Sequence, residues 1–389
     1  MRNESYDVVV IGAGPSGVMA AAKAAEAGAR TILLEKETNP GRKVCAEGIL
    51  AEALPDAEVK PSKEFVANEI SGAVLYPPDE KKKLNIGGAG YILDKPSFLT
   101  VLARRAQGEG AFIGYGAVVE DILRDNGHMV VRGREDNEPF TLTSGIVIGC
   151  DGVGSIVARR FFPRKNYVAV AALQYSMNNC NIEDETKLEI YVGHEKAPSG
   201  YVWVFPKGKR EANVGIGLKG SNAKQLLDRF IARHPLMFEG SQVEASHAAP
   251  VPVGGQVEQY VTDNVMLCGD AAGQVVPLTG AGIHTGLVSG KLAGAVAGEA
   301  IQKGDHSARI LNKYRDRFEE VFGTRISNSL KAMESYERLS DEDLNIIADY
   351  LEGQDLVEMA NGFNPMRAVG LLVHHPVLAI KVAYQLLTS

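Results

Sequence analysis

The chain has 389 residues, of which 45% are hydrophobic and 23% charged, the balance of a folded globular protein. This excludes a disordered or fibrous protein, and the length predicts two domains or one large elaborated domain. With 41 basic and 48 acidic residues the formal net charge is −7, which argues against a nucleic-acid-binding protein that relies on a positive field. The 42 glycines are about 11% of the chain, against about 7% in average proteins. Because they fall in short clusters, they indicate backbone packed closely against a ligand.

The cysteines and the chain start bear on compartment and metal content. Cys45, Cys150, Cys180 and Cys268 are widely separated and form no C-x-x-C pair, so we predict no metal site and no iron–sulfur cluster. So few cysteines in a long chain argue against a disulfide framework and favour the reducing cytoplasm. The first residues lack the basic and apolar regions of a signal peptide. No apolar run reaches the roughly 20 residues that span a bilayer.

A strand–helix–strand unit opens the chain. Residues 6–11 form a β-branched run typical of a buried parallel strand, and 18–29 are an alanine-rich helix. The G-x-G-x-x-G motif between them allows a tight turn, lets a pyrophosphate approach the backbone and lets helix and strand pack closely. The second strand, 31–34, ends on Glu35, whose carboxylate is placed to accept hydrogen bonds from ribose hydroxyls. The predicted nucleotide-binding residues here are Gly12, Gly14, Pro15, Ser16, Gly17, Glu35 and Lys36.

A second G-x-G-x-x-G match lies at 215–220. Its first two glycines alternate within the strand-like run ANVGIGL, and no following strand ends in an acid at the right distance. We therefore predict a strand and a turn here rather than a nicotinamide-nucleotide site.

Two later segments favour FAD over NAD. A strand over 145–149 leads into an Asp-Gly pair, which is either a simple turn or a second cofactor contact. A strand over 265–268 leads into GDAAG and a glycine-rich helix start. Asp270 is suited to hold a ribityl chain, and the amides of 280–283 to face the negative end of an isoalloxazine ring. His284 is either a donor to flavin or substrate or an exposed residue. The predicted cofactor-binding residues in these segments are Asp151, Gly152, Gly269, Asp270, Gly280, Gly282 and Ile283.

The order GAGPSG…E…DG…GDAAG resembles the FAD-binding oxidoreductases related to p-hydroxybenzoate hydroxylase. Within that group the chain resembles the geranylgeranyl reductase family, including archaeal digeranylgeranylglycerophospholipid reductases, from about residue 5 to residue 330. Residues 40–49, PGRKVCAEGI, are similar to the family's Lys-x-Cys-Gly-x-Gly stretch. YVWVFPKG at 201–208 and NVGIG at 213–217 are close to its Y-x-W-x-F-P-K-G…N-V-G-I-G signature.

The cysteine loop departs from the family pattern at Ala46, where glycine is common. A single cysteine is usually an inert small hydrophobe, but the charges of Arg42 and Lys43 favour a thiolate at Cys45. The resemblance implies that Cys45 lies close to the flavin and influences reduction. We therefore expect Arg42, Cys45 and Ala46 at the cofactor, with Cys45 as the catalytic candidate.

Aromatic residues alternate along the YVWVFPKG stretch. Tyr201, Trp203 and Phe205 share one strand face, which is either a sheet core or the wall of an apolar slot. The resemblance favours a pocket wall with Trp203 as the main contact. The predicted substrate-binding residues are Tyr201, Trp203, Phe205, Pro206 and Gly217. A phosphate head group would need basic residues, for which Lys81–Lys83 or Lys207, Lys209 and Arg210 are candidates, although charge runs are usually solvated.

The pattern of elements predicts an α/β fold. We expect a Rossmann-like FAD-binding domain with a parallel sheet and helices, an antiparallel-sheet substrate domain with an amphipathic helix near 222–234, and a helical C-terminal region. Apolar residues at helical spacing from Ile310 to Met333 suggest one long helix. The expected boundaries are 1–60, 95–165 and 262–305 for the discontinuous FAD-binding domain, 61–94 and 166–261 for the substrate domain, and 306–389 for the helical region.

The last segment, 364–389, carries no acidic residue. Its apolar residues are too interrupted to span a bilayer. It is either a pair of packing helices or an interfacial anchor with sparse positive charge. Peripheral contact with a membrane therefore stays open beside the cytoplasmic location.

These features predict an FAD-dependent reductase of isoprenoid carbon–carbon double bonds. On the resemblance, its substrates are geranylgeranyl chains of archaeal-type membrane lipid precursors. Hydride would pass from N5 of the reduced flavin to one alkene carbon, and a proton would reach the other, in a mainly apolar slot. The expected partners are the isoprenoid lipid and an electron donor, ferredoxin or NAD(P)H, with no nucleic acid.

Two alternatives share these features. The first is a flavin-dependent monooxygenase or halogenase on the same fold, although the halogenase pattern W-x-W-x-I-P is not matched at Tyr201 and Phe205. The second is a non-catalytic flavin-containing lipid carrier. Fold analogy does not distinguish them, because this architecture supports several chemistries.

Overall fold

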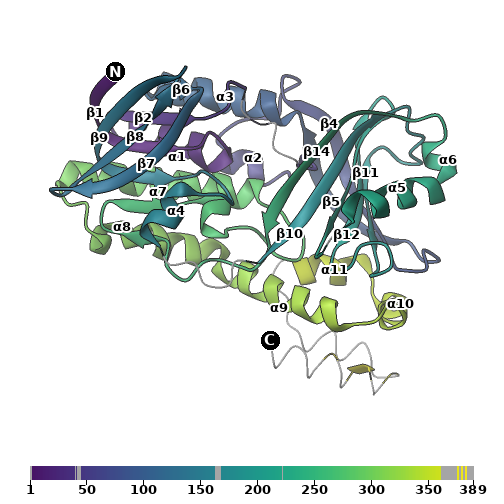
Figure 1. The fold of residues 1–389 in the computed structure, drawn as a ribbon. Coiled ribbons are helices and arrows are strands. Elements are labelled where there is room, and N and C mark those ends of the chain that lie inside the picture. The colour runs from purple at the N-terminus through teal and green to yellow at the C-terminus, as the bar shows by residue number, and fades with distance from the viewer. Residues whose placement is uncertain are drawn as a thin grey trace.

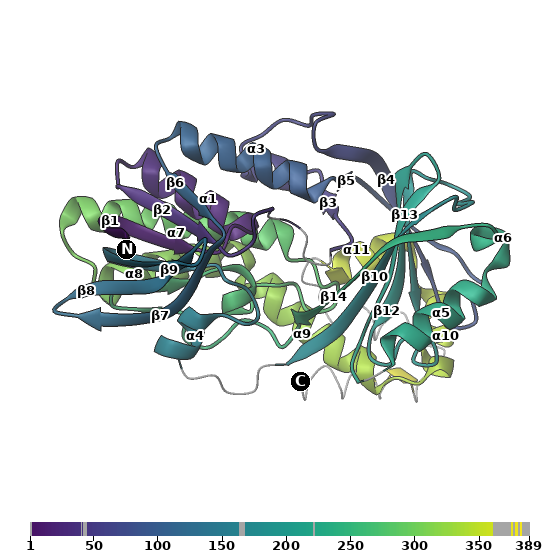
Figure 2. The ribbon, with the colours of Figure 1, turned by 45° about the horizontal axis from the view of Figure 1, so that its top comes forward.

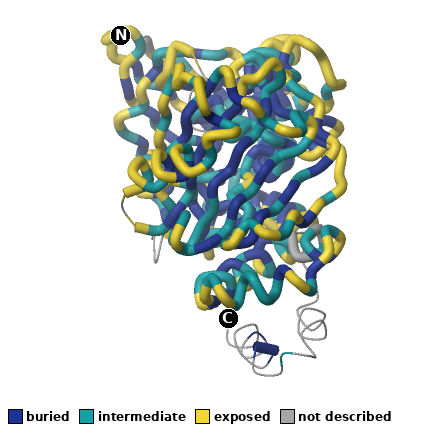
Figure 3. The backbone as a smooth tube through the Cα atoms, turned by 90° about the vertical axis from the view of Figure 1, so that its right-hand side faces the viewer, coloured by how far each residue is buried: buried dark blue, intermediate teal, exposed yellow. Residues whose placement is uncertain are grey.

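The computed structural model shows two lobes joined by helices of the C-terminal region (Figures 1 and 2). It describes residues 2–39, 41, 45–162, 168–220 and 222–360, and beyond them 375, 378, 379 and 382. In this part of the chain each lobe holds one eight-stranded sheet. Buried residues concentrate on these sheets and the helices packed on them, while exposed residues follow the outer loops (Figure 3).

The first sheet brings the predicted cofactor-binding segments to one edge. Its central strands run in the order β16-β9-β1-β2-β6 and pair in parallel, so their carboxyl ends meet. The glycine motif follows β1, Glu35 ends β2, and Asp151 and Asp270 follow β9 and β16. The strands are β1 (Arg2–Ile11), β2 (Thr31–Glu35), β6 (Phe112–Tyr115), β7 (Ala117–Asp125), β8 (His128–Glu135), β9 (Glu138–Gly149), β15 (Val261–Thr262) and β16 (Val265–Leu267).

Helix α1 (Pro15–Glu26) packs unusually closely against α7 (Ile283–Lys303). A Cβ built on Gly290 would lie 2.0 Å from the Ser16 carbonyl oxygen, and one on Gly294 would lie 2.3 Å from that of Ala20. Small residues at helical spacing therefore let the two backbones touch. The remaining helices of this lobe are α2 (Ala53–Asp56), α3 (Lys95–Gly108) and α4 (Ile156–Phe161).

The second sheet is antiparallel except where β11 pairs in parallel with β4. Its order is β14-β10-β13-β12-β11-β4-β5-β3. Helices α5 (Ala223–Arg233) and α6 (Pro235–Phe238) pack on one face of it, and the opposite face lines a large cavity. The strands are β3 (Gly48–Leu50), β4 (Val66–Tyr76), β5 (Leu84–Leu93), β10 (Ala169–Asn178), β11 (Lys187–Val192), β12 (Tyr201–Gly208), β13 (Glu211–Leu218) and β14 (Gln242–Pro252).

Two features of this sheet differ from the sequence interpretation. Strand β3 pairs with β5, although residues 48–50 were expected within the FAD-binding domain. Strand β14 was not predicted at all, because its residues are mostly exposed or half-buried and give no apolar pattern. The second G-x-G-x-x-G match begins within β13, so the prediction of a strand there is confirmed.

The C-terminal region begins with one long helical rod, as predicted. It consists of α8 (Ala308–Phe318), a π-helical turn (Glu319–Gly323) and α9 (Thr324–Arg338), and it runs from the first lobe to beneath the second (Figures 1 and 2). Helices α10 (Asp341–Tyr350) and α11 (Gly353–Ala360) follow. Most of the 364–389 segment lies outside the described residues, but Leu378 and Val382 pack with Leu339 and α10. Within the described residues, none of the helices combines the length and the apolar character needed to span a membrane.

A charge cluster around Glu58 ties together the helices that surround the glycine motif. The Glu58 carboxylate accepts from Lys23 of α1 at 2.8 Å, from Lys291 of α7 at 2.9 Å and from Arg105 of α3. Burial opposes its ionisation, but the hydrogen bonds from the three cations outweigh burial and lower the pKa of Glu58 to about 2.

We expect this cluster to make stability pH-dependent. Folding lowers the pKa of Glu58 from the usual 4.5 to about 2. The cluster therefore contributes to the free energy of unfolding above pH 4.5, and this contribution is lost as the pH falls towards 2. Glu58→Gln should lower the free energy of unfolding by about 1–2 kcal/mol at neutral pH, a figure discounted for partial exposure. Urea unfolding at neutral pH and near pH 3 should show this difference shrinking in acid. A Glu64→Gln control, which breaks an exposed pair with Arg104, should cost less than about 0.5 kcal/mol. Equal losses for both variants at both pH values would contradict this account.

Candidate functional site

A cavity of about 1410 Å³ lies between the two lobes. Its walls are the carboxyl edge of the first sheet, one face of the second sheet and the helices α9–α11. The lining is thus polar and glycine-rich at one end and apolar at the other.

The glycine turn after β1 forms the polar end. Gly12 has a φ of +99°, and a Cβ on it would lie 2.4 Å from the Cys150 carbonyl oxygen. A Cβ on Gly17 would lie 1.7 Å from the Gly12 carbonyl oxygen, so this residue sits behind the turn and outside the lining. Gly14, in contrast, faces open space, because an added Cβ would meet no heavy atom of the described residues within 4 Å apart from those of its chain neighbours. The turn therefore presents bare backbone to the cavity, as a pyrophosphate requires.

Glu35 supports the turn from the neighbouring strand. Its Oε2 accepts from the Ala13 amide at 2.6 Å, and its Oε1 accepts from the Glu37 amide at 2.9 Å. Both Glu35 and the exposed Lys36 line the cavity, beside Pro15 and Ser16 of α1. The predicted residues of this unit, apart from Gly17, are thus brought together.

Asp151 provides a test of whether the site suits FAD. Its Oδ2 accepts from the Ile156 amide at 2.6 Å, while its Oδ1 is buried and meets no hydrogen-bond partner among the described residues. Burial raises the pKa of this carboxyl group. Since Asp151 lines the cavity, a hydroxyl donor of a bound ligand would satisfy Oδ1, and the sugar and ribityl hydroxyls of FAD are such donors. The residues present therefore fit the cofactor.

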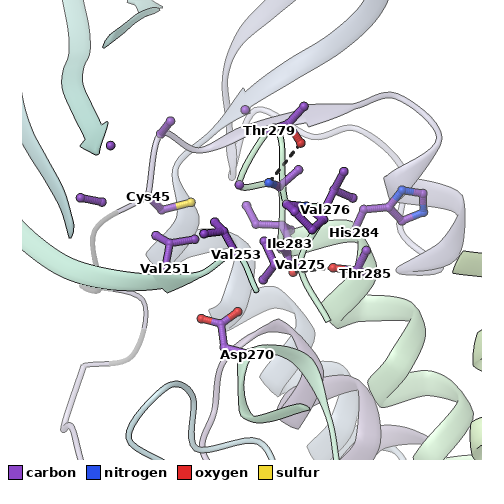
Figure 4. A pocket seen from close by; sticks show the side chains of 18 of the residues that line it. Cys45, Val251, Val253, Asp270, Val275, Val276, Thr279, Ile283, His284 and Thr285 are labelled. Carbon is purple, nitrogen blue, oxygen red and sulfur yellow. Dashed lines mark hydrogen bonds between the residues drawn. The ribbon is translucent and has the colours of Figure 1, made fainter. Parts of the chain in front are cut away.

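The GDAAG turn is held by a buried network that the sequence analysis missed. Gln274 Oε1 accepts from the Gly269 amide at 2.7 Å, and Gln274 Nε2 donates to the Tyr314 hydroxyl at 2.8 Å. Tyr314, from α8, donates to the Leu267 carbonyl at 2.9 Å. Asp270 is thereby placed at the base of the cavity, opposite Cys45 (Figure 4). The other predicted residues of this region that line the cavity are Gly152, Gly269, Gly280, Gly282 and Ile283.

Tyr201, Trp203 and Phe205 line the cavity from β12, with Gly217 of β13 beside them. The Trp203 indole donates to Gln174 Oε1 at 3.2 Å and packs over Gly215, where an added Cβ would lie 2.2 Å from the ring. The prediction of a slot rather than a closed core thus agrees with the lining. Pro206, however, lies on the other strand face and outside the lining, because neighbouring strand residues point to opposite sides.

Tyr201 also connects the two lobes. Its hydroxyl donates to the Thr279 carbonyl at 2.5 Å, in the loop that leads to α7. Burial, together with the nearby Cys45, raises the pKa of Tyr201 to about 12. The hydroxyl therefore stays protonated at neutral pH and keeps donating its hydrogen bond to the Thr279 carbonyl.

The cysteine loop approaches the cavity from the other side. Cys45 is half-buried and directs its thiol towards the wall formed by Val276 and Ile283 (Figure 4). Ala46 packs against the aromatic wall. Arg42 and Lys43, expected to act on Cys45, lie outside the described residues.

His284 has a structural partner. Its Nε2 lies 2.6 Å from Asp56 Oδ2, and its ring packs edge-on against Phe322 at 5.3 Å between ring centroids. Its side chain is only 17% exposed, so the exposed alternative is wrong. Figure 4 shows the ring turned away from Asp270 and Cys45.

The apolar end was not predicted from sequence. Leu75, Ile86 and Ile190 of the second sheet line it together with Ala348 and Leu351 of the C-terminal region. The apolar spacing of α10 and α11 was the available signal, but only tertiary packing shows what these helices cover. The described residues contain no cluster of His, Cys, Asp and Glu able to hold a metal ion.

Comparison with family models also divides the chain into a cofactor part and a reductase part. Residues 7–163 match the model described as FAD dependent oxidoreductase, and residues 169–249 match that of the geranylgeranyl reductase catalytic domain. The chain is 37% identical to digeranylgeranylglycerophospholipid reductase 2 of Methanopyrus kandleri, over 98% of this chain and 99% of that one. It is 38% identical to the digeranylgeranylglycerophospholipid reductase of Methanothrix thermoacetophila, over 91% and 93%.

The chain is also similar to solved structures. A geranylgeranyl bacteriochlorophyll reductase-like protein from Thermoplasma acidophilum superimposes with a TM-score of 0.88 at 31% identity, covering 98% of this chain and 100% of that one. A flavin-dependent brominase superimposes with a TM-score of 0.73 at only 15% identity, covering 98% of both chains. The second likeness concerns the fold alone.

Gly14 and Gly17 provide a matched test of the glycine turn. Gly14→Ala should leave the folded chain intact, because the added methyl enters open space, but should weaken FAD binding at least about ten-fold. Gly17→Ala should instead destabilise the cofactor-free protein by about 2 kcal/mol or more, because the methyl overlaps a carbonyl oxygen. Fluorescence titration with FAD and thermal unfolding of the cofactor-free protein measure the two effects. A Gly14→Ala variant that binds FAD as tightly as the unsubstituted protein would refute the cradle.

Proposed function

Since the chain belongs to the geranylgeranyl reductase family of FAD-dependent oxidoreductases, we propose that it saturates the isoprenoid C=C bonds of digeranylgeranylglycerophospholipid-type membrane lipid precursors. The observation that carries this proposal is the continuity of the cavity. The glycine-rich end of the cavity, where we place the cofactor, opens directly into an apolar chamber. This chamber is lined by both the second sheet and α9–α11.

The cavity walls suit an unactivated alkene. Such a bond has no carbonyl group to polarise, so binding and orientation must come from apolar contact. Trp203 and Phe205 form one wall, while Val251 and Val276 approach from other elements. Exclusion of water from this end favours transfer to carbon over side reactions.

Two hydrogens must reach the alkene. When bound, reduced FAD supplies a hydride from N5. We assign the proton for the other alkene carbon to the thiol of Cys45, because Sγ projects into the cavity opposite Asp270 (Figure 4). Water would then return a proton to the thiolate. We also propose that the predicted cofactor-binding residues that line the cavity bind FAD.

Two of the predicted basic residues hold other segments of the chain. Lys207 pairs with Glu47 at 2.6 Å, and Lys82 donates to the carbonyl groups of Ala348 and Asp349 at the end of α10. These contacts make both lysines structural ties between segments. We therefore propose that affinity comes mainly from the chains of the lipid.

The reaction also needs an electron donor, and the lipid substrate must reach the protein from a membrane. We propose that ferredoxin or NAD(P)H reduces the cofactor transiently, and that the protein contacts a membrane surface peripherally to receive its lipid. The acid-free 364–389 segment supports such contact. Reduction of bound FAD by each donor, followed by absorbance, distinguishes the two.

The main test is turnover of the lipid itself. Holoenzyme with chemically reduced FAD and digeranylgeranylglycerophospholipid should yield products with one added H₂ for each C=C bond, detected by mass spectrometry. Oxygen-dependent hydroxylated or halogenated product would favour the monooxygenase alternative. Lipid recovered unchanged under reducing conditions would favour a carrier.

Cys45→Ser tests the assigned proton donor. Because a hydroxyl is a much weaker acid than a thiol, we expect turnover to fall about 10²-fold while FAD stays bound. Single-turnover oxidation of reduced FAD by the lipid measures the step directly. A Cys180→Ser control, at a residue outside the cavity lining, should behave as the unsubstituted protein. Unchanged turnover in the Cys45→Ser variant would make Cys45 a packing residue only.

A further inference from the structure

Glu47, two residues after Cys45, is the point at which three motifs of the chain meet. Its Oε2 accepts from Lys207 Nζ at 2.6 Å and from Asn213 Nδ2 at 2.8 Å. Lys207 lies next to the end of the YVWVFPKG stretch on β12, and Asn213 begins the NVGIG stretch on β13. The cysteine loop is thus tied to the wall of the apolar slot by one carboxylate.

The backbone at Glu47 is held in a costly conformation. Its φ is +67°, in the left-handed region that non-glycine residues rarely adopt. The main chain is anchored on both sides, because the Leu93 amide donates to the Glu47 carbonyl at 2.9 Å and the Glu47 amide donates to Cys45 Sγ at 3.4 Å. A strained residue that directly contacts the candidate catalytic sulfur indicates a positioning role rather than a chance turn.

The contacts around Glu47 leave little freedom. Its side chain is 12% exposed and that of Lys207 is 21% exposed, while Asn213 is buried. Asn213 Nδ2 also donates to the Ala46 carbonyl at 3.3 Å, and a Cβ on Gly48 would lie 3.0 Å from the Phe205 ring. The residues before and after Glu47 are therefore pressed against the aromatic wall. A partly buried charge pair of this kind is costly to break from one side only.

We propose that the Glu47–Lys207–Asn213 contact is a latch that positions Cys45 in the cavity, with Glu47 as a positioning residue for the reaction. This deepens the proposed function and rests on it for the part that Cys45 takes in catalysis. The latch would act through loop position and not by contact with the lipid. It would also keep the cysteine loop and the substrate wall moving as one body.

The accessibility of the Cys45 thiol reports loop position without turnover. Cys45 is half-buried, whereas Cys150, Cys180 and Cys268 are buried, so N-ethylmaleimide should modify Cys45 selectively in the FAD-saturated holoenzyme. Peptide mass spectrometry and a Cys45→Ser control identify the modified residue. In Glu47→Gln and Lys207→Met we expect the alkylation rate to rise about five-fold or more, through local opening.

Matched variants separate positioning from general damage. Lys207→Arg should restore a nearly unaltered alkylation rate, because a guanidinium group can also reach the carboxylate. Lys83→Met, which breaks an exposed pair with Glu183 between the loops that lead into β5 and β11, should leave the rate unaltered. Glu47→Gly relieves the left-handed backbone but removes the hydrogen bonds that the carboxylate accepts from Lys207, Asn213 and the Lys95 amide. It should therefore alkylate as fast as Glu47→Gln. An unaltered rate in Glu47→Gly would assign the role to backbone shape alone and overturn the latch.

The double variant Glu47→Gln/Lys207→Met should alkylate no faster than either single variant, because both act on one contact. Unaltered alkylation in Glu47→Gln and Lys207→Met would also overturn the latch. If Glu47→Gln fails to fold, Lys207→Met still tests the same contact. Faster alkylation together with failure of the lipid assay would refute the proposed reductase function while leaving the latch in place.

Discussion

Close approach of backbone to backbone around α1 is the constraint on which the rest of the structure depends. Gly17 rests on the Gly12 carbonyl, and Gly290 of α7 rests on that of Ser16, with no room for a methyl group at either place. These contacts fix the glycine turn at the carboxyl edge of the parallel sheet. Because the strands are parallel, the same edge gathers Glu35, Asp151 and Asp270 from segments far apart in the chain.

The second sheet turns this edge into one end of a larger chamber. It contributes Trp203 and its neighbours on one face, while α5 covers the other face. Specific polar contacts cross between the lobes. Tyr201 reaches the loop before α7, and Lys207 and Asn213 reach Glu47. Since each joins β12 or β13 to a loop at the polar end of the cavity, the polar and apolar ends of the cavity keep a defined relation.

The C-terminal helices close the chamber instead of forming a separate unit. The rod from α8 to α9 supplies Tyr314 to the network beneath Asp270 and then continues towards the second sheet. Helix α11 abuts β5 so closely that a Cβ on Gly353 would lie 1.7 Å from the Asn85 carbonyl oxygen. One region thus supports the cofactor end and caps the apolar end.

Local sequence determined the elements whose chemistry is confined to neighbouring residues. The glycine spacing after β1, the acid that ends β2 and the alternating aromatics of β12 each follow from a strand period or a turn requirement. These patterns were sufficient for the fold class, for FAD as the cofactor and for most of the residues that line the polar end of the cavity. Only the tertiary structure decided that Pro206 faces away, that His284 pairs with Asp56, that β3 joins the second sheet and that Glu47 meets Lys207. The physical reason is that side-chain pairing across more than a hundred residues, and the packing of α10 and α11 over a sheet, depend on how separate elements are brought together. No local period or turn chemistry records that arrangement.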